Sequence, residues 1–227
     1  MADKVLVENR GAVRILRINR PEVRNCVDGE TAVGLGDGIE AFALDPSARV
    51  LVVTGSGGVS FCAGADLKDP ASLFQHRHLD SAGPMGFARL DPGKPTIAAI
   101  NGFCFAGGFE LAAWCDFRIA ASNAEFGCLS RRWGVPYLDG GTQRFARIMG
   151  VGNALYLLET GARIDAQRAM ALGEFRAVRS MDQRNVRHHR HIPAKRIVDL
   201  LLARAVRQMV VAADDVGDTH VVVVDDH

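Results

Sequence analysis

Residues 101–116 read NGFCFAGGFELAAWCD, and this stretch decides both the fold and the chemistry that the sequence predicts. Glu110 is its only carboxylate apart from the last residue, and it follows Gly107 and Gly108 in an otherwise small or apolar run. These glycines open a predicted helix over 107–115, so their N–H groups lie at its positive end and can stabilise an oxyanion. One such donor is worth roughly 3 kcal/mol of a reaction barrier. Glu110 is therefore either an exposed helix residue behind glycines that allow tight packing, or an acid/base beside a backbone anion site.

The composition is that of an ordinary globular protein. The chain has 227 residues, 48% hydrophobic and 23% charged, with a formal net charge of +1. That length suits one large domain or two small ones, and the charge does not point to nucleic acid or a membrane surface. We find no signal peptide and no apolar run of about 20 residues, and five scattered cysteines without a C-x-x-C pair are typical of reduced thiols. We therefore expect a cytoplasmic protein.

Strands and helices are predicted to alternate along the chain. Residues 4–21 alternate apolar and polar side chains around Asn9, Arg10 and Gly11, which indicates a hairpin of two strands. Continuous apolar runs predict buried strands rather than half-buried ones, which favours an α/β fold with a covered sheet. Buried strands are expected at 50–54, 96–100 and 117–121, helices at 28–44, 107–115, 141–150, 152–161 and from Asp165, and a loop or loose helix at 71–85.

The sequence predicts neither a dinucleotide cofactor nor a metal ion. VLVVTGSGG at 50–58 begins like a dinucleotide-binding unit, but the fingerprint requires a third glycine opening a helix, and Ser60 stands there. The cluster HHRH at 188–191 could bind a metal. Adjacent histidines rarely point one way, however, and this spacing matches no standard site.

A second glycine-containing segment, SFCAGADLK at 60–68, also places small residues where a ligand could approach the backbone. Together with 94–127 (KPTIAAINGFCFAGGFELAAWCDFRIAASNAEFG), it resembles the enoyl-CoA hydratase/isomerase, or crotonase, family. INRPEVRN, GGTQRFARIMG and TGARIDAQRAMALG also match the pattern of that family. The resemblance covers roughly residues 4–173, with several motifs in the right order and at the right separations.

The resemblance implies a crotonase-like spiral of ββα repeats with a C-terminal helical region used in packing a homotrimer or hexamer. It implies acyl-CoA thioester substrates in lipid metabolism, with no cofactor beyond the coenzyme A of the substrate. The oxyanion hole would be formed by the backbone N–H groups of Ala65 and Gly107. Arg24 and Lys68 would lie near the adenine or phosphates, although each could equally be a solvated surface charge. The residues bordering coenzyme A would be Arg24, Ala63, Asp66, Leu67 and Lys68.

The sequence departs from the hydratase pattern at the second catalytic position. Glu110 stands where hydratases have their first catalytic glutamate, but Ser130 stands where they have the second. Asp139 is the nearby carboxylate and is a candidate partner for Glu110. It could instead cap the helix that begins at residues 140–142. Three functions stay open: an enoyl-CoA hydratase-like enzyme, an isomerase or related enzyme using a single glutamate, and a non-catalytic acyl-CoA-binding homologue.

The chain also departs from the family after residue 173. We divide it into a core at 1–173 and an atypical tail at 174–227, which is partly helical or disordered and includes a helical pattern at 194–211. The tail holds five of the seven histidines. Its composition is typical either of another reading frame of GC-rich coding DNA or of a divergent tail, and both put the expected trimer in doubt.

Overall fold

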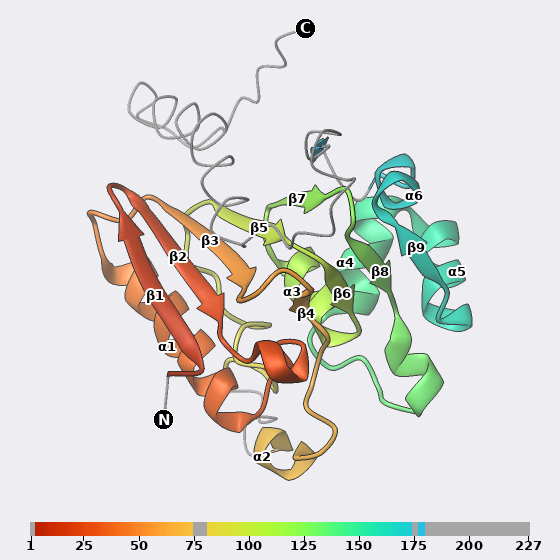
Figure 1. Ribbon diagram of the computed structural model, residues 1–227, viewed down its shortest axis with the longest axis horizontal. Helices are drawn as coiled ribbons and strands as arrows, with labels where there is room; N and C mark the ends of the chain where they lie inside the picture. Colours follow the sequence, from red (N-terminus) through yellow and green to blue (C-terminus); the bar gives the residue numbers. More distant parts are fainter. Residues whose placement is uncertain (1–2, 75–80, 174–176, 180–227) are drawn as a thin grey trace, which may run out of the picture.

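The computed structural model of the chain describes residues 3–74, 81–173 and 177–179 (Figure 1). The larger of its two sheets has the strand order β1-β2-β3-β5-β7-β10. Strands β1 and β2 are antiparallel, and every later neighbour in this sheet is parallel. The strands are β1 (Val5–Arg10), β2 (Val13–Ile18), β3 (Val50–Gly55), β5 (Thr96–Ile100), β7 (Phe117–Ala121) and β10 (Ala177–Arg179).

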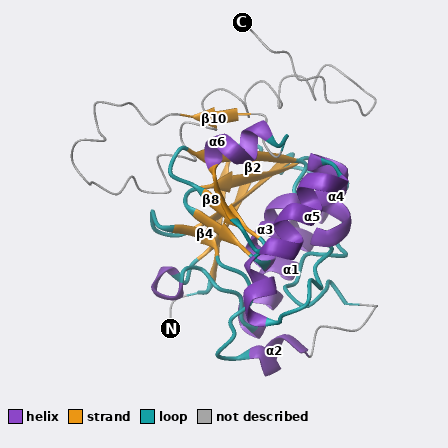
Figure 2. Cartoon of the chain, turned by 90° about the vertical axis from the view of Figure 1, so that its right-hand side faces the viewer, coloured by secondary structure: helices purple, strands orange, loops and turns teal. Residues whose placement is uncertain are grey.

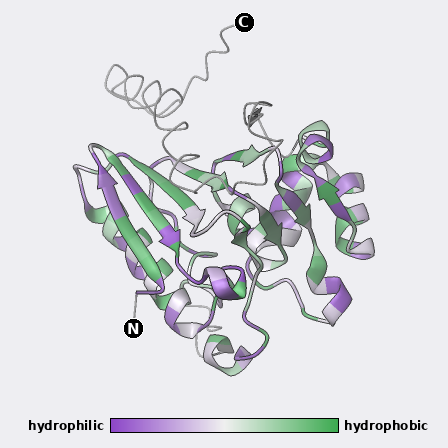
Figure 3. Ribbon diagram, viewed as in Figure 1, coloured by the Kyte–Doolittle hydropathy of each residue, from purple (hydrophilic) through white to green (hydrophobic). Residues whose placement is uncertain are grey.

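The first two strands form the predicted hairpin. Val5 pairs with Ile18 and Arg10 pairs with Val13, and the turn contains Gly11 at φ +58°. β1 lies at the edge of the sheet and is hydrophobic in its first half and hydrophilic in its second, whereas β2 and β3 are hydrophobic along most of their length (Figure 3). The inner strands are buried on both faces, as expected for parallel strands covered on both sides.

The smaller sheet was not predicted. It has the order β4-β6-β8-β9, and each of its strands has three residues: β4 (Ser60–Cys62), β6 (Phe103–Phe105), β8 (Glu125–Gly127) and β9 (Arg163–Asp165). Each of the first three directly follows a strand of the larger sheet: β4 follows β3, β6 follows β5 and β8 follows β7. The chain therefore repeats a long strand, a short strand and a helical segment, which agrees with the expected ββα repeat.

The predicted helices are confirmed. Asp28 accepts a 2.9 Å hydrogen bond from Thr31 N at the start of α1, and Asp165 accepts one of 2.7 Å from Arg168 N at the start of α6. Segment 71–85 contains the end of a short helix and then turns from residue 81; residues 75–80 lie outside the described part of the chain. The helices are α1 (Gly29–Leu44), α2 (Pro70–Phe74), α3 (Gly107–Trp114), α4 (Gly141–Met149), α5 (Val151–Thr160) and α6 (Ala166–Ala171), with 3₁₀ turns η1 (Pro21–Val23) and η2 (Leu129–Trp133).

Helix α3 is held in the centre of the molecule. It contacts α4 and strands β4, β5 and β6, and Figure 2 shows α1, α3, α4 and α5 gathered on one side of the strands. The ring of Phe109 on α3 lies 4.5 Å from that of Phe145 on α4 and 5.6 Å from that of Phe126 on β8. All three rings are fully buried. This packing fixes the first turn of α3, where Glu110 lies.

The predicted histidine cluster, the helical pattern at 194–211 and nearly all of the proposed tail lie outside the described residues. Within the described part, no helix is long and apolar enough to span a bilayer. The five cysteines are all free thiols, and four of them are buried.

Candidate active site

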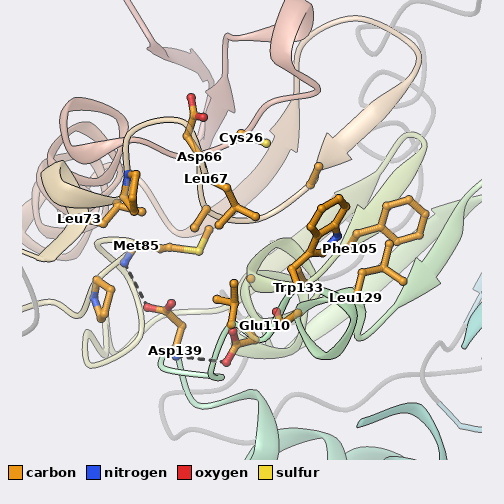
Figure 4. Close-up of a pocket in the computed structure, with 18 of the residues that line it drawn as sticks. Cys26, Asp66, Leu67, Leu73, Met85, Phe105, Glu110, Leu129, Trp133 and Asp139 are labelled. Carbon is orange, nitrogen blue, oxygen red and sulfur yellow. Dashed lines mark hydrogen bonds between the residues drawn. The ribbon is translucent and has the colours of Figure 1, made fainter. Parts of the chain in front are cut away.

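A cavity of about 730 Å³ opens beside the start of α3, and every site residue that the sequence predicted lines it. Its walls come from η1, the 63–68 loop, the 84–85 turn, the start of α3 and the segment from η2 to residue 139. Figure 4 shows Glu110 and Asp139 on one wall, with Leu67 and Cys26 across from them. Apolar side chains make up much of the rest of the wall: Leu73, Met85, Phe105, Leu129, Trp133 and Leu138.

Two backbone N–H groups meet at the cavity, those of Ala65 and Gly107. Val27 N donates to Gly64 O and Asp66 N donates to Val27 O, so the N–H of the intervening Ala65 points away from this bridge. A Cβ atom on Gly64 would lie only 3.0 Å from Gly107 N, which shows how closely the two segments approach. Neither N–H group has an acceptor among the described residues. Two neighbouring N–H groups without acceptors could bind a negatively charged oxygen, so the oxyanion hole stays a prediction.

The two glycines before Glu110 have different roles. A Cβ atom at Gly108 would collide with the carbonyl of Cys62 on β4, so this glycine allows tight helix–strand packing. At Gly107 a Cβ atom would collide with the Met85 sulfur, at the end of a flexible side chain. Ala106 precedes them at φ +51°, a backbone conformation that side chains rarely adopt and that is often found at functional sites. The packing interpretation is therefore confirmed for Gly108, while the anion-binding role of Gly107 stays a prediction.

Glu110 is 2% exposed, so its interpretation as a surface residue is wrong. Its Oε1 accepts hydrogen bonds from the backbone N–H groups of Gly141 at 2.8 Å and Asp139 at 3.1 Å. The second oxygen has no hydrogen-bond partner among the described residues. Burial raises the pKa of Glu110 from 4.5 to about 7, and the nearby Asp139 carboxylate acts in the same direction. A carboxylate with such a pKa can both accept and return a proton near neutral pH.

Asp139 is 4% exposed and lies next to Glu110. Its Oδ1 accepts a 3.1 Å hydrogen bond from Met85 N, and burial raises its pKa from 3.8 to about 6. The alternative that Asp139 caps the following helix is wrong, because Gly140 is the N-cap of α4 and no side chain caps it. The N–H group of Gly141 is taken by Glu110 instead.

The residues predicted to border coenzyme A lie at the mouth of the cavity. Arg24 and Lys68 are exposed, and the Arg24 guanidinium lies 5.3 Å from the centre of the Phe103 ring. Asp66 is buried, and its carboxylate accepts hydrogen bonds from Arg20 at 3.0 Å and from the backbone of Lys68 at 3.1 Å. Asp66 therefore orders its own loop. Ala63 and half-exposed Leu67 complete this part of the wall.

Sequence reasoning missed four residues around the site. Met85 packs on Gly107, and Trp133 lies at the rim with 73% exposure. Arg144 donates two hydrogen bonds beside the carboxylates, and the buried Tyr137 hydroxyl lies near Cys128 and Ser130 without a hydrogen bond of good geometry in the described structure. Arg144 could have been found from its place on α4 next to Phe145, since a charged residue beside the buried face of a helix needs partners. Within the described ranges, no cluster of His, Cys, Asp and Glu could hold a metal ion.

A family model described as enoyl-CoA hydratase/isomerase matches residues 8–216. The chain belongs to the enoyl-CoA hydratase/isomerase family. It is 40% identical over 174 residues to a crotonyl-CoA hydratase of Syntrophomonas wolfei, a match covering 75% of this chain and 67% of that protein. It is 35% identical over 177 residues to a carnitinyl-CoA dehydratase of Citrobacter koseri, covering 76% and 67%. The crystal structure of an enoyl-CoA hydratase from Mycobacterium marinum superposes with a TM-score of 0.78 at 31% identity, covering 94% of this chain and 81% of that one.

These matches confirm the resemblance and the crotonase-like α/β fold. The family match continues past Gly173 to residue 216, further than the motifs of the sequence indicated. The division of the chain at residue 173, the role of each site residue and the oligomeric state stay predictions.

Proposed function

We propose that the chain catalyses the addition of water to the double bond of an α,β-unsaturated acyl-CoA thioester, and the reverse reaction. The observation that carries the proposal is the placement of Glu110. It is a buried carboxylate with one free oxygen, and it lines the same cavity as Ala65 and Gly107, whose backbone N–H groups have no acceptor in the described structure. An acid/base and an oxyanion site that line one cavity suit the chemistry next to a thioester carbonyl.

In the proposed reaction, the N–H groups of Ala65 and Gly107 hold the thioester oxygen. Glu110 takes a proton from water as the water oxygen bonds to the β-carbon, and the electrons of the double bond move to the thioester oxygen as an enolate. The enolate then collapses, and the α-carbon takes a proton from the Glu110 carboxyl. One water has been added, and the enzyme has returned to its starting state.

Asp139 is proposed as the second carboxylate, in place of the glutamate that Ser130 replaces. It lines the same cavity as Glu110, and its backbone N–H group donates to the Glu110 carboxylate. Its side chain can position the attacking water from that wall. Arg24 and Lys68 are proposed to contact the phosphates of coenzyme A, because both are exposed cations at the cavity mouth.

The proposal is tested by incubating the protein with crotonyl-CoA, longer 2-enoyl-CoA esters and 3-enoyl-CoA esters, followed by mass analysis of the products. A gain in mass of one water supports hydration. Ser130 specifically favours one alternative, since isomerisation needs only a single carboxylate that moves a proton between carbons; it would give an unchanged mass and a moved double bond. Saturable binding without any product would overturn both and support a non-catalytic acyl-CoA-binding protein.

A further inference from the structure

Arg144 lies on α4 beside both carboxylates of the site, yet its hydrogen bonds go to backbone carbonyls. Its Nη1 donates to Asp139 O at 2.6 Å, and its Nη2 donates to Ala88 O at 2.7 Å. The guanidinium lies so close over Gly140 that a Cβ atom there would collide with it. No carboxylate lies within ion-pair distance of Arg144 in the described part of the chain. Arg144 therefore binds the peptide units around the acid/base pair rather than a carboxylate directly.

These contacts make Asp139 one of the most restrained residues of the site. Its N–H group donates to Glu110, its carbonyl accepts from Arg144, and its side chain accepts from Met85 N. Met85 and Ala88 belong to the same turn, so Arg144 and the Asp139 side chain form two links between that turn and the start of α4. Without Arg144, only the hydrogen bond from Met85 N to the Asp139 side chain still ties this segment, and the N–H groups that orient Glu110, to the 85–88 turn.

The charge of Arg144 also acts on both carboxylates. Burial raises the pKa of Glu110 and of Asp139, and the half-buried Arg144 guanidinium lowers both. The other groups facing the pair from neighbouring elements are Arg89, which also lowers the pKa of Asp139, and the neutral Tyr137 hydroxyl and Cys62 thiol. Arg144 is thus the one cation that acts on both members of the pair among the described residues.

We propose that Arg144 is a positioning residue for the acid/base pair. Its guanidinium fixes the Asp139–Gly140 peptide, which lies between the two peptides whose N–H groups hold Glu110, and its charge offsets the negative charge of two adjacent buried carboxylates. This inference rests on the proposed function for its catalytic meaning, but the restraint and the electrostatic effect exist without turnover.

The test uses the full chain with Arg144→Met, Arg144→Lys and, as the matched control, Arg147→Met. Arg147 lies three residues further along α4 and is exposed, so its removal takes away the same charge from the outer face of the same helix. The carboxyl pKa values of Glu110 and Asp139 are measured by carbon-13 NMR titration without substrate. The pH profile of kcat/KM is measured separately on the thioester that is turned over.

Arg144→Met is expected to raise both carboxyl pKa values by about one unit, since a nearby opposite charge typically contributes 1–3 units. The acid limb of the kcat/KM profile should move to higher pH by the same amount. Arg144→Lys keeps the charge but cannot reach both carbonyls, so it should keep the pKa values within about half a unit while kcat falls at least roughly tenfold, a typical consequence of misplacing a catalytic group. Arg147→Met should match the wild type in both measurements.

The inference is overturned if folded Arg144→Met shows unchanged pKa values, if Arg147→Met shifts them equally, or if Arg144→Lys behaves like Arg144→Met in the titration. If Arg144→Met does not fold, Arg144→Lys decides by its kcat and its retained pKa values. Absence of turnover in every variant including the wild type would refute the proposed function, while the titration would still test the role of Arg144.

Discussion

Replacing Glu110 by Gln should abolish most turnover while leaving the fold intact. The Gln side chain keeps an oxygen that can accept the two backbone hydrogen bonds from Asp139 and Gly141. The substitution replaces the other carboxylate oxygen, Oε2, by an amide NH₂ group that cannot accept a proton. Loss of a general acid/base typically costs 10²–10⁴-fold in rate, so kcat with crotonyl-CoA should fall by at least about 100-fold.

The same substitution should change how stability depends on pH. The folded-state pKa of Glu110 is raised from 4.5 to about 7, so the folded protein binds the proton more tightly than the unfolded chain. The stability contributed by the protonated carboxyl is complete below pH 4.5, is lost as the pH rises toward 7, and stays lost above it. The difference corresponds to about 3 kcal/mol. Glu110→Gln lacks this loss and should be the more stable protein at pH 8, by up to about that amount.

The rate is followed as the loss of enoyl-thioester absorbance, and stability is measured by urea unfolding at pH 5 and pH 8. Ser130→Ala is the matched control for the rate, because it changes a small buried side chain in the same cavity wall that the proposed reaction does not use. Retention of more than a tenth of the wild-type rate would refute the acid/base role. A Glu110→Gln variant that is less stable than the wild type at pH 8 would refute the argument that burial of the ionised Glu110 carboxylate destabilises the folded protein.

Three further predictions follow from the same wall of the cavity. Gly107→Pro removes one oxyanion donor at the first helix position, where proline is tolerated, and should lower kcat by roughly 10²–10³-fold. The new side chain also displaces the flexible Met85 side chain, so circular dichroism checks that the fold is kept. Gly141→Ala places a Cβ atom 2.6 Å from Glu110 Cγ, so it should lower both kcat and the melting temperature. Tyr137→Phe removes a buried hydroxyl that makes no hydrogen bond of good geometry in the described structure, so the melting temperature should stay equal or rise. A clear decrease would show that the hydroxyl bonds to the nearby Cys128 or Ser130.

The elements that could be predicted from sequence are those whose signal is local. The hairpin, strands β3, β5 and β7 and the helices each carry a long periodic or apolar run. The N-cap residues Asp28 and Asp165 accept from N–H groups only three positions further along the chain. The strands of the small sheet have three residues each, which is too short for alternation to be visible. Three of them, β4, β6 and β8, are placed by the strand of the larger sheet that directly precedes each one.

The carboxylates and the glycines of the candidate site were visible in the sequence, but their contacts and the residues around them were not. Glu110 and Gly107 were visible because a carboxylate among apolar residues behind two glycines is locally anomalous. The partner of the Asp139 side chain was not visible, because Met85 lies 54 positions away and donates through its backbone, which carries no residue-type signal. For the same reason Asp139 was open to interpretation as a helix cap, while the cap position is in fact Gly140 and the N–H group of Gly141 belongs to Glu110.

The first N–H groups of helices α3 and α4 have different roles in the site. The first N–H groups of α3 and α4 both lack partners within their own helices, as at any helix start. At α4 the Gly141 N–H is used internally, where it holds Glu110 Oε1, whereas at α3 the Gly107 N–H is left without an acceptor in the described structure. Glu110 belongs to α3 and reaches across to α4, so the packing of Phe109 on Phe145 fixes both helix starts at once. The orientation of the carboxylate, its raised pKa and its distance from the oxyanion donors therefore depend on one interface, and loosening that interface should impair all three together.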